Sequence, residues 1–176
     1  MCVRSKLTAI GLLAAVLLLA GCGDDSTDTA AGTTTTTAPP AATPGPFFGE
    51  CGSVSDDEVK AAFAIPELPV VTRNSVGCVW ESGDFFGPSV SFSWYRGSPI
   101  GREAAGSGLI GRPPERIEIA GREGFRGSLG SELCEIGLQY GDNFFHWSVT
   151  YSATPATADP CKVATDLATL TASRAE

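Results

Sequence analysis

Apolar and polar residues alternate along much of the second half of the chain. Val90, Phe92 and Trp94, for example, are separated from one another by serines. A period of two is typical of antiparallel strands that bury one face and leave the other in water. The same alternation predicts strands at residues 76–80, 116–119, 134–140 and 144–151.

Helix signals occur on both sides of this strand-rich region. Ser55 and Glu58 have the spacing of a capping box, and the apolar positions that follow predict a helix that ends before Pro66. Near the C-terminus, Asp159 and Pro160 have the order of an N-cap and a first helical residue, and a stripe of apolar residues follows them. We therefore expect a helix at each end of the domain.

The order of elements defines the fold class. It is a helix, two strands, a glycine-containing segment at 98–108 that fits either a short helix or a loop, three or four strands, and a helix. This order predicts an α+β fold, in which an antiparallel sheet of about five or six strands carries the N- and C-terminal helices on one face. We place this domain at residues 47–176, which is long enough for one core.

The first residues have the pattern of an export signal. Arg4 and Lys6 precede an apolar run at 7–20, which is the order of charged and apolar regions in a secretory signal. The run is shorter than the roughly 20 residues that a membrane-spanning helix needs. We therefore expect residues 1–21 to be a cleaved signal peptide rather than a permanent anchor.

The end of this segment resembles the lipobox of bacterial lipoproteins, with the sequence Leu19-Ala20-Gly21-Cys22. In that motif the signal is cut before the cysteine, whose sulfur and new amine then receive acyl chains. The resemblance implies that Cys22 anchors the mature chain to the outer face of the cell membrane. Two or more acyl chains make such an anchor effectively permanent.

Cys22 is followed by a linker that reaches residue 46. Residues 23–46 contain eight Thr, four Pro and no aromatic residue, so they cannot form a core and predict an extended, disordered tether that is a candidate for O-glycosylation. The whole chain has a net charge of −8, and loss of Arg4 and Lys6 with the signal leaves −10. We therefore expect no nucleic-acid partner, since nucleic-acid binding needs a basic surface.

Four cysteines in an exported domain predict two disulfides. Cys51 and Cys161 each lie at the start of a helix, whereas Cys78 and Cys134 each lie on the inward face of a strand. Pairing the cysteines by these contexts predicts Cys51–Cys161 and Cys78–Cys134. We expect no metal site, because the chain has no CxxC spacing and only one histidine.

The placement of the cysteines and tryptophans is similar to that in the actinobacterial envelope lipoproteins of unknown function collected as DUF 3558. The matching features are the lipobox, the Thr-rich linker, Gly77-Cys78-Val79-Trp80, the strand cysteine Cys134 and Asp159-Pro160-Cys161. The resemblance covers residues 47–176 and implies an envelope lipoprotein of a high-GC Gram-positive bacterium, with no established activity. The layout is also similar to that of Mog1/PsbP-like α/β/α domains.

The sequence motifs that are typical of catalytic sites are incomplete in this chain. Residues 106–111 satisfy GxGxxG, but Arg112-Pro113-Pro114 follows them instead of a helix, so we interpret them as a flexible loop and expect no cofactor. His146 lies on the solvent-facing side of its predicted strand, and no GxSxG motif supplies a serine for it. Acidic pairs of the kind a glycosidase uses are Glu81 with Asp84 and Glu132 with Glu135, and solvated surface charge explains them more simply.

Two groups of residues are candidates for binding. The first consists of two adjacent aromatic pairs, in each of which only one side chain is readily buried. The second consists of arginines in a locally basic stretch, which could bind phosphate or carboxylate groups. The candidates are Phe47, Phe48, Phe85, Phe86, Arg112 and Arg116.

These observations lead to one expected function and two alternatives. We expect a lipid-anchored envelope lipoprotein whose domain is not an enzyme and binds a protein, glycan or lipid. The first alternative is an envelope hydrolase that uses paired carboxylates. The second is a structural surface protein without a specific ligand.

Overall fold

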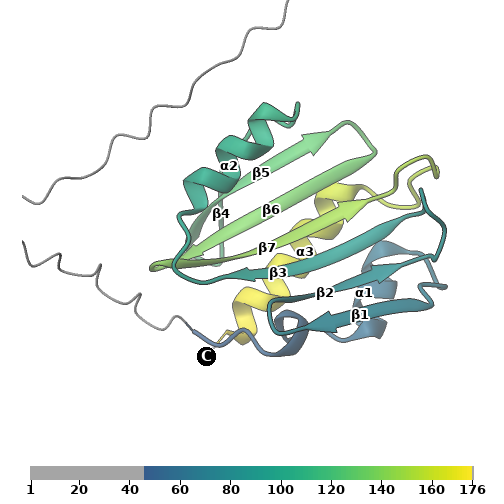
Figure 1. Cartoon of the computed structure of the whole chain (residues 1–176), viewed down its shortest axis with the longest axis horizontal. Helices are drawn as coiled ribbons and strands as arrows, with labels where there is room; N and C mark the ends of the chain where they lie inside the picture. The colour runs from purple at the N-terminus through teal and green to yellow at the C-terminus, as the bar shows by residue number, and fades with distance from the viewer. Residues whose placement is uncertain (1–45, 176) are drawn as a thin grey trace, which may run out of the picture. The chain divides into compact units, whose positions relative to one another are not determined.

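The computed structural model describes residues 46–175. The predicted signal peptide, the lipobox with Cys22 and the linker up to residue 45 lie outside the described residues. Within residues 46–175 the chain forms seven strands and four helical segments (Figure 1). The helical segments are η1 (Glu50–Ser53), α1 (Asp56–Phe63), α2 (Ile100–Leu109) and α3 (Pro160–Arg174). The strands are β1 (Val70–Asn74), β2 (Gly77–Glu81), β3 (Ser89–Tyr95), β4 (Glu115–Ile119), β5 (Arg122–Leu129), β6 (Leu133–Tyr140) and β7 (Asn143–Thr150).

The strands form one antiparallel sheet with helices on both faces. The strand order is β1-β2-β3-β7-β6-β5-β4. α1 and α3 lie on one face and α2 lies on the other (Figure 1). Alternation along β6 shows the two faces directly, since Cys134 is bonded to Cys161 of α3 whereas Glu135 contacts Ser107 of α2. The predicted α+β class, with both terminal helices on one face, is confirmed.

The sheet has one more strand than the upper limit of the prediction, and the additional strand is β1. This strand contains Thr72, Arg73 and Asn74, all exposed, and it pairs only with β2 at the edge of the sheet. An edge strand with polar side chains on both faces lacks the alternation that identifies half-buried strands. The adjacent Val76, expected in the next strand, lies in the turn between β1 and β2 and is 59% exposed.

The uncertain segment at 98–108 forms most of helix α2. The stretch 106–111, expected to be a flexible loop, instead contains the end of this helix. The amide of Ile110 donates to the carbonyl of Ser107 at 3.2 Å, and the amide of Arg112 donates to the same carbonyl at 3.0 Å. These two bonds satisfy one of the carbonyl groups that a helix end leaves free, and they hold the residues after the helix in place.

The caps of the two terminal helices match their predictions. The side chain of Ser55 accepts from the Glu58 amide, and the Glu58 carboxylate accepts from the Ser55 amide at 2.9 Å. At α3, the Asp159 carboxylate accepts from the Lys162 amide at 2.7 Å, and Pro160 occupies the first turn. The last carbonyl of α1, that of Phe63, accepts a hydrogen bond of 2.8 Å from the buried hydroxyl of Tyr151.

The core lies between the sheet and the α1–α3 layer. Trp80 of β2 and Trp147 of β7 stack with their ring centroids 5.7 Å apart. Both indoles are fully buried, and each donates its N–H to a helix: Trp147 to Thr171 of α3 at 3.0 Å, and Trp80 to Asp56 of α1 at 2.8 Å. A buried indole N–H needs a partner, so these bonds also fix the positions of the helices on the sheet.

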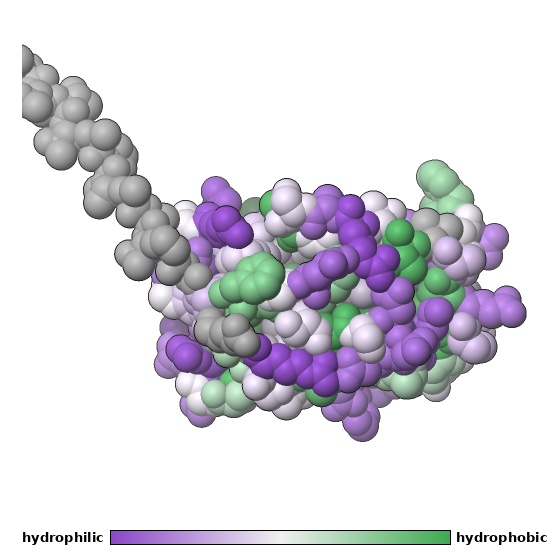
Figure 2. Space-filling model, turned by 90° about the horizontal axis from the view of Figure 1, so that it is seen from below, coloured by the Kyte–Doolittle hydropathy of each residue, from purple (hydrophilic) through white to green (hydrophobic). Residues whose placement is uncertain are grey.

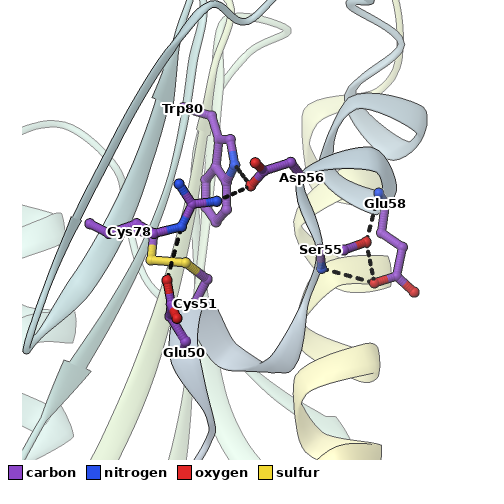
Figure 3. A network of polar contacts seen from close by, with 8 residues as sticks. Glu50, Cys51, Ser55, Asp56, Glu58, Cys78 and Trp80 are labelled. Atoms are coloured by element: carbon purple, nitrogen blue, oxygen red, sulfur yellow. Dashed lines mark hydrogen bonds and ion pairs between the residues drawn. A yellow bond between two sulfur atoms is a disulfide. The ribbon is translucent and has the colours of Figure 1, made fainter.

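Asp56 connects α1 to the first two strands. Its carboxylate accepts from Trp80 and from Arg73, whose guanidinium also contacts Glu50 at 3.0 Å. Figure 3 shows Asp56 and Trp80 pointing toward each other beside the disulfide between Cys51 and Cys78. The hydrogen bond from Trp80, followed by the contacts with Arg73, holds the pKa of Asp56 below its usual value. Because these groups satisfy one another, the hollow of about 640 Å³ at this surface is lined by a structural network.

A bidentate ion pair joins the start of α1 to the end of α3. Arg174 donates to both carboxylate oxygens of Glu58, at 2.7 and 3.0 Å, and to the carbonyl of Ser53 at 2.6 Å. The hydrogen bonds from Arg174, followed by those from Ser55, lower the pKa of Glu58 to about 2. The capping box and this pair share one carboxylate, so the start of α1 and the end of α3 are positioned together.

The surface seen from below the view of Figure 1 has no single broad apolar area. In Figure 2, hydrophobic patches on this side are separated by hydrophilic side chains. Charged side chains on an edge strand prevent it from pairing with a strand of another chain. Arg73 in the edge strand β1 is one such side chain.

The disulfide pairing predicted from local context is wrong. The bonds join Cys51 to Cys78 and Cys134 to Cys161, with Cα–Cα distances of 5.3 and 5.0 Å. Cys78 lies on β2 and Cys134 on β6, and β3 and β7 separate these strands in the sheet. Three strand spacings amount to roughly 14 Å, which is about twice the largest Cα–Cα distance that a disulfide spans. Each bond therefore joins a strand to the helical segment that packs directly over it.

This pairing makes a testable prediction about stability. Both bonds have a sequence separation of 27, so the loop-entropy relation assigns each about 3.5 kcal/mol of stabilisation. We expect the double variants C51A/C78A and C134A/C161A to lose similar amounts of unfolding free energy in urea titrations. Peptide mapping of the non-reduced chain should recover the Cys51–Cys78 and Cys134–Cys161 cross-links, and recovery of Cys51–Cys161 would contradict the structure.

Candidate functional site

The strands beneath helix α2 present glycines, which leave room for the side chains of the helix. A Cβ atom added to Gly127 of β5 would lie 2.4 Å from the Ser107 hydroxyl oxygen. A Cβ atom on Gly137 of β6 would lie 3.3 Å from the Ile100 side chain and 2.6 Å from that of Phe125. Any larger residue at these two positions would displace the helix or its neighbours. The absence of side chains at Gly127 and Gly137 therefore allows polar groups of α2 to reach the sheet.

Four polar residues meet at the C-terminal end of α2, and we name them the Glu135 cluster: Ser107, Arg112, Glu135 and His146. Glu135 is only 3% exposed. One of its carboxylate oxygens accepts from the Ser107 hydroxyl and lies 3.2 Å from Arg112 Nε, and the other lies 3.1 Å from His146 Nε2. A buried carboxylate is tolerated only with such partners, because removing it from water is costly.

The hydrogen-bond and charge partners of Glu135 affect its pKa more strongly than burial does. Burial raises the pKa of Glu135, but the hydrogen bonds from His146 and Ser107, together with the nearby positive charge of Arg112, lower it by more, so the net pKa lies below its ordinary value. Glu135 is therefore an ionised group inside the interface. Its contacts tie the end of α2 to both β6 and β7.

The Glu135 cluster does not have the geometry of a hydrolytic triad. In a serine hydrolase the imidazole lies between the serine and the carboxylate and takes the serine proton. Here the carboxylate of Glu135 lies between Ser107 and His146. Ser107 is also only 4% exposed, so a substrate could not reach its hydroxyl. The arrangement positions the helix and offers no nucleophile.

A groove with a volume of about 770 Å³ lies beside the cluster, between the N-terminal half of α2 and the hairpin of β4 and β5. We call it the α2 groove. A volume in this range is typical of small-molecule sites. The groove stays open because two small residues of α2, Gly101 and Ala104, line it where larger ones would fill it, and a Cβ atom at Gly101 would meet no atom within 4 Å. The rest of its lining is Ile100, Pro114, Glu115, Arg116, Ile117, Glu118, Glu123, Gly124, Phe125 and Gln139.

The residues predicted to bind are not brought together. Phe48 is fully buried, whereas Phe47 is 61% exposed and lies edge-on to Trp94, with ring centroids 6.0 Å apart. Phe85 and Phe86 are both exposed, at 93% and 73%, so the expectation that one of them would be buried is wrong. They lie in the β2–β3 loop, at the opposite end of the sheet from the start of the described chain (Figure 1).

The two candidate arginines belong to different sites. Arg112 is nearly buried and belongs to the Glu135 cluster, and Arg116 is exposed and lines the α2 groove. His146, expected in solvent, is 7% exposed because α2 covers its face of the sheet. Its ring lies nearly parallel to that of Phe125, at a centroid distance of 6.1 Å.

Sequence reasoning missed the role of Glu135, which it treated as half of a surface pair with Glu132. Glu132 is exposed in the β5–β6 turn, whereas Glu135 is committed to its partners. A signal was present, because Glu135 is the one charged residue among residues 133–140. Among residues 46–175, no group of three potential metal-ligating side chains is found.

The Glu135 cluster predicts a large and local effect of one substitution. Glu135→Gln leaves Arg112 with no carboxylate partner in the interface, so we expect a loss of about 3 kcal/mol of unfolding free energy. Glu132→Gln, in the exposed turn, should stay within about 0.5 kcal/mol of wild type. Urea unfolding measures both values, and hydrogen exchange should show faster opening of α2. Equal stability of the two variants would refute the role assigned to Glu135.

Comparison with known proteins places the chain among actinobacterial relatives. A chain from Mycobacterium tuberculosis and one from Mycobacterium bovis, both named "Putative lipoprotein LprB", are each 42% identical over 171 residues, which is 93% of this chain and 92% of theirs. A protein of the same name from Mycobacterium leprae is 43% identical over 129 residues, 70% of this chain and 68% of its own. No solved structure matches the chain. The model of the family "Protein of unknown function (DUF3558)" matches residues 17–174, and the chain belongs to this family.

Proposed function

We propose that the protein is a lipid-anchored binding module on the outer face of the cell membrane, and that it binds its ligand in the α2 groove without catalysis. The observation that carries this proposal is the groove itself, an open space with an apolar floor that the fold maintains beneath a helix. The lipoprotein names of the relatives support a membrane-anchored envelope protein. Cys22 is the proposed site of the anchor.

The anchor is proposed from the N-terminal sequence alone. In the part of the chain that the structure describes, no helix is long and apolar enough to cross a membrane. The described chain begins at residue 46, so 23 residues separate it from Cys22. A flexible chain of this length spans on the order of 25–30 Å, which is sufficient to hold the domain clear of the lipid headgroups.

The geometry favours binding over the hydrolase alternative. The most buried ionisable groups near the groove, Glu135 and His146, face each other and not the groove. Neither acidic pair considered from the sequence lines the groove. The groove also distinguishes the proposal from a purely structural role, since a protein that only fills space has no need to keep such a hollow open.

The anchor has a direct test with a matched control. We expect Cys22→Ser to abolish labelling by an alkyne-bearing fatty acid and to leave the chain as a heavier precursor on gels, because the cut before residue 22 depends on the lipobox cysteine. Cys2→Ser, in the predicted signal peptide, should leave both properties unchanged, because that residue is removed before the mature chain forms. Retention of the fatty-acid label by Cys22→Ser would disprove anchoring at this residue.

The groove is tested with an uncharged apolar probe, 1-octanol, and the full mature chain carrying Cys22→Ser. In NMR titrations we expect saturable shifts in the amides of Gly124, Phe125 and Gln139. Ala104→Phe should weaken binding at least fivefold by filling the groove, because Ala104 lines it. Ala105→Phe, one position along α2 and exposed, should bind like wild type.

The folded state of both variants is checked by circular dichroism. If Ala104→Phe perturbs the fold, Gly101→Leu replaces it, since a Cβ atom at Gly101 meets no atom within 4 Å. Shifts that spread over the whole surface, or that persist unchanged when the groove is filled, would disprove a binding site at the α2 groove.

A further inference from the structure

We propose that the α2 groove selects ligands that carry an ammonium group on an apolar stem. This inference rests on the proposed function, because it assigns a ligand class to the same groove. It is carried by two features that lie within the one cavity: an apolar floor and an excess of unpaired carboxylates at the β4–β5 side.

The floor of the groove suits an alkyl stem. Ile100 and Ala104 contribute from α2, Pro114 from the segment before β4, and Phe125 from β5. Phe125 itself is 4% exposed, so its ring is held rigidly beneath the groove. Each methylene group of a ligand that is buried in such an environment increases the affinity, because apolar surface is removed from water. The apolar part of the ligand therefore supplies affinity but no charge selectivity.

Charge selectivity comes from two glutamates that face each other across the ladder. Glu118 of β4 pairs in register with Glu123 of β5, and both side chains line the groove. Directly opposed residues in an antiparallel pair have Cβ atoms about 5 Å apart, and like charges at this spacing repel each other. Among residues 46–175 neither carboxylate makes an ion pair. A bound cation would relieve this repulsion, whereas a bound anion would increase it.

The other polar groups of the groove leave this preference in place. Glu115 is already paired with Arg126 on the neighbouring strand. Arg116 is the one cationic side chain in the lining, so Glu118 and Glu123 together exceed it by one charge. The Nε2 of Gln139 donates to the carbonyls of Gly141 and Asn143, which orients its Oε1 as a further acceptor. Carboxylate and amide oxygens are the partners that an ammonium group needs, since it has three donors and no acceptor.

The test compares three probes with the same eight-carbon chain: octylammonium, 1-octanol and octanoate. Each is titrated below its micellar concentration into the full mature chain carrying Cys22→Ser. We expect octylammonium to bind at least fivefold more tightly than 1-octanol, and octanoate to bind more weakly than either. Both carboxylates are exposed, so salt screens them. In 0.5 M salt the Debye length falls to about 4 Å, and we expect the difference in affinity between octylammonium and 1-octanol to become smaller.

The matched variants separate charge from shape. In E118Q/E123Q the side chains keep their size, so we expect the affinity for 1-octanol to be unchanged. The fivefold preference for octylammonium should disappear, so that the two probes bind with about equal affinity. Glu132→Gln, an exposed glutamate outside the groove, should retain the preference. Persistence of the preference in E118Q/E123Q would overturn the assignment of selectivity to these carboxylates.

The outcomes also separate this inference from the proposed function. If 1-octanol and octylammonium bind equally well at the groove, the proposed binding site stands and the ligand class is wrong. If none of the three probes binds there, both proposals fail. An added arm with an acetylated tripeptide containing lysine identifies the source of the amine. Tighter binding of the peptide than of octylammonium indicates a peptide side chain, and the reverse indicates a lipid-like amine.

Discussion

The buried carboxylate of Glu135 is the interaction on which the α2 layer depends. Helix α2 has few large apolar side chains, and Ser107 is its one buried residue. Apolar burial alone therefore cannot hold it on the sheet in the way that it holds α3, which buries Val163 and Leu167 among others. The contacts of Glu135 with Ser107, Arg112 and His146 replace this missing apolar surface. Because they act at one end of the helix, the other end is left spanning an open groove.

The opposite face of the sheet is built on a different principle. There each disulfide joins a strand to the helical segment above it, and the stacked indoles of Trp80 and Trp147 fill the space between. The cross-links and the large buried aromatic residues make this side resistant to local opening. The α2 side has glycines in both layers, and its polar contact lies beside only a small set of buried aromatic residues, Phe125 and Phe144. Segments with little apolar burial are those that open at low cost in free energy, which is what ligand entry requires.

Features encoded by a few neighbouring residues could be predicted from the sequence. The capping box of Ser55 and Glu58 and the N-cap at Asp159 depend only on spacing along the chain, and both form as expected. The disulfide pairing could not be predicted in this way. It depends on strand order, and the return of β7 to a position between β3 and β6 separates Cys78 from Cys134.

The candidate site could not be predicted from the sequence for a related reason. Alternation along β7 assigned His146 to the face opposite the core, and this assignment is correct. Alternation does not show whether another layer covers that face, however, and the glycines of α2 weaken the helix signal that would have revealed it. Without α2 in place, Glu135 resembles an ordinary surface residue and Glu118 and Glu123 have no cavity to line. The groove exists only in the tertiary structure.

The arrangement of the carboxylates bears on the proposal that the groove binds a ligand and does not catalyse a reaction. Hydrolysis by two carboxylates needs one that holds a proton and one that does not, a difference produced by placing them in unlike environments. Glu118 and Glu123 are both exposed, and they face each other at equivalent positions of one ladder, so their surroundings do not distinguish them. The one carboxylate in a distinct environment, Glu135, is already engaged in holding α2. A pair of equivalent negative charges over an apolar floor can attract and orient a cation, but it supplies no separate acid and base.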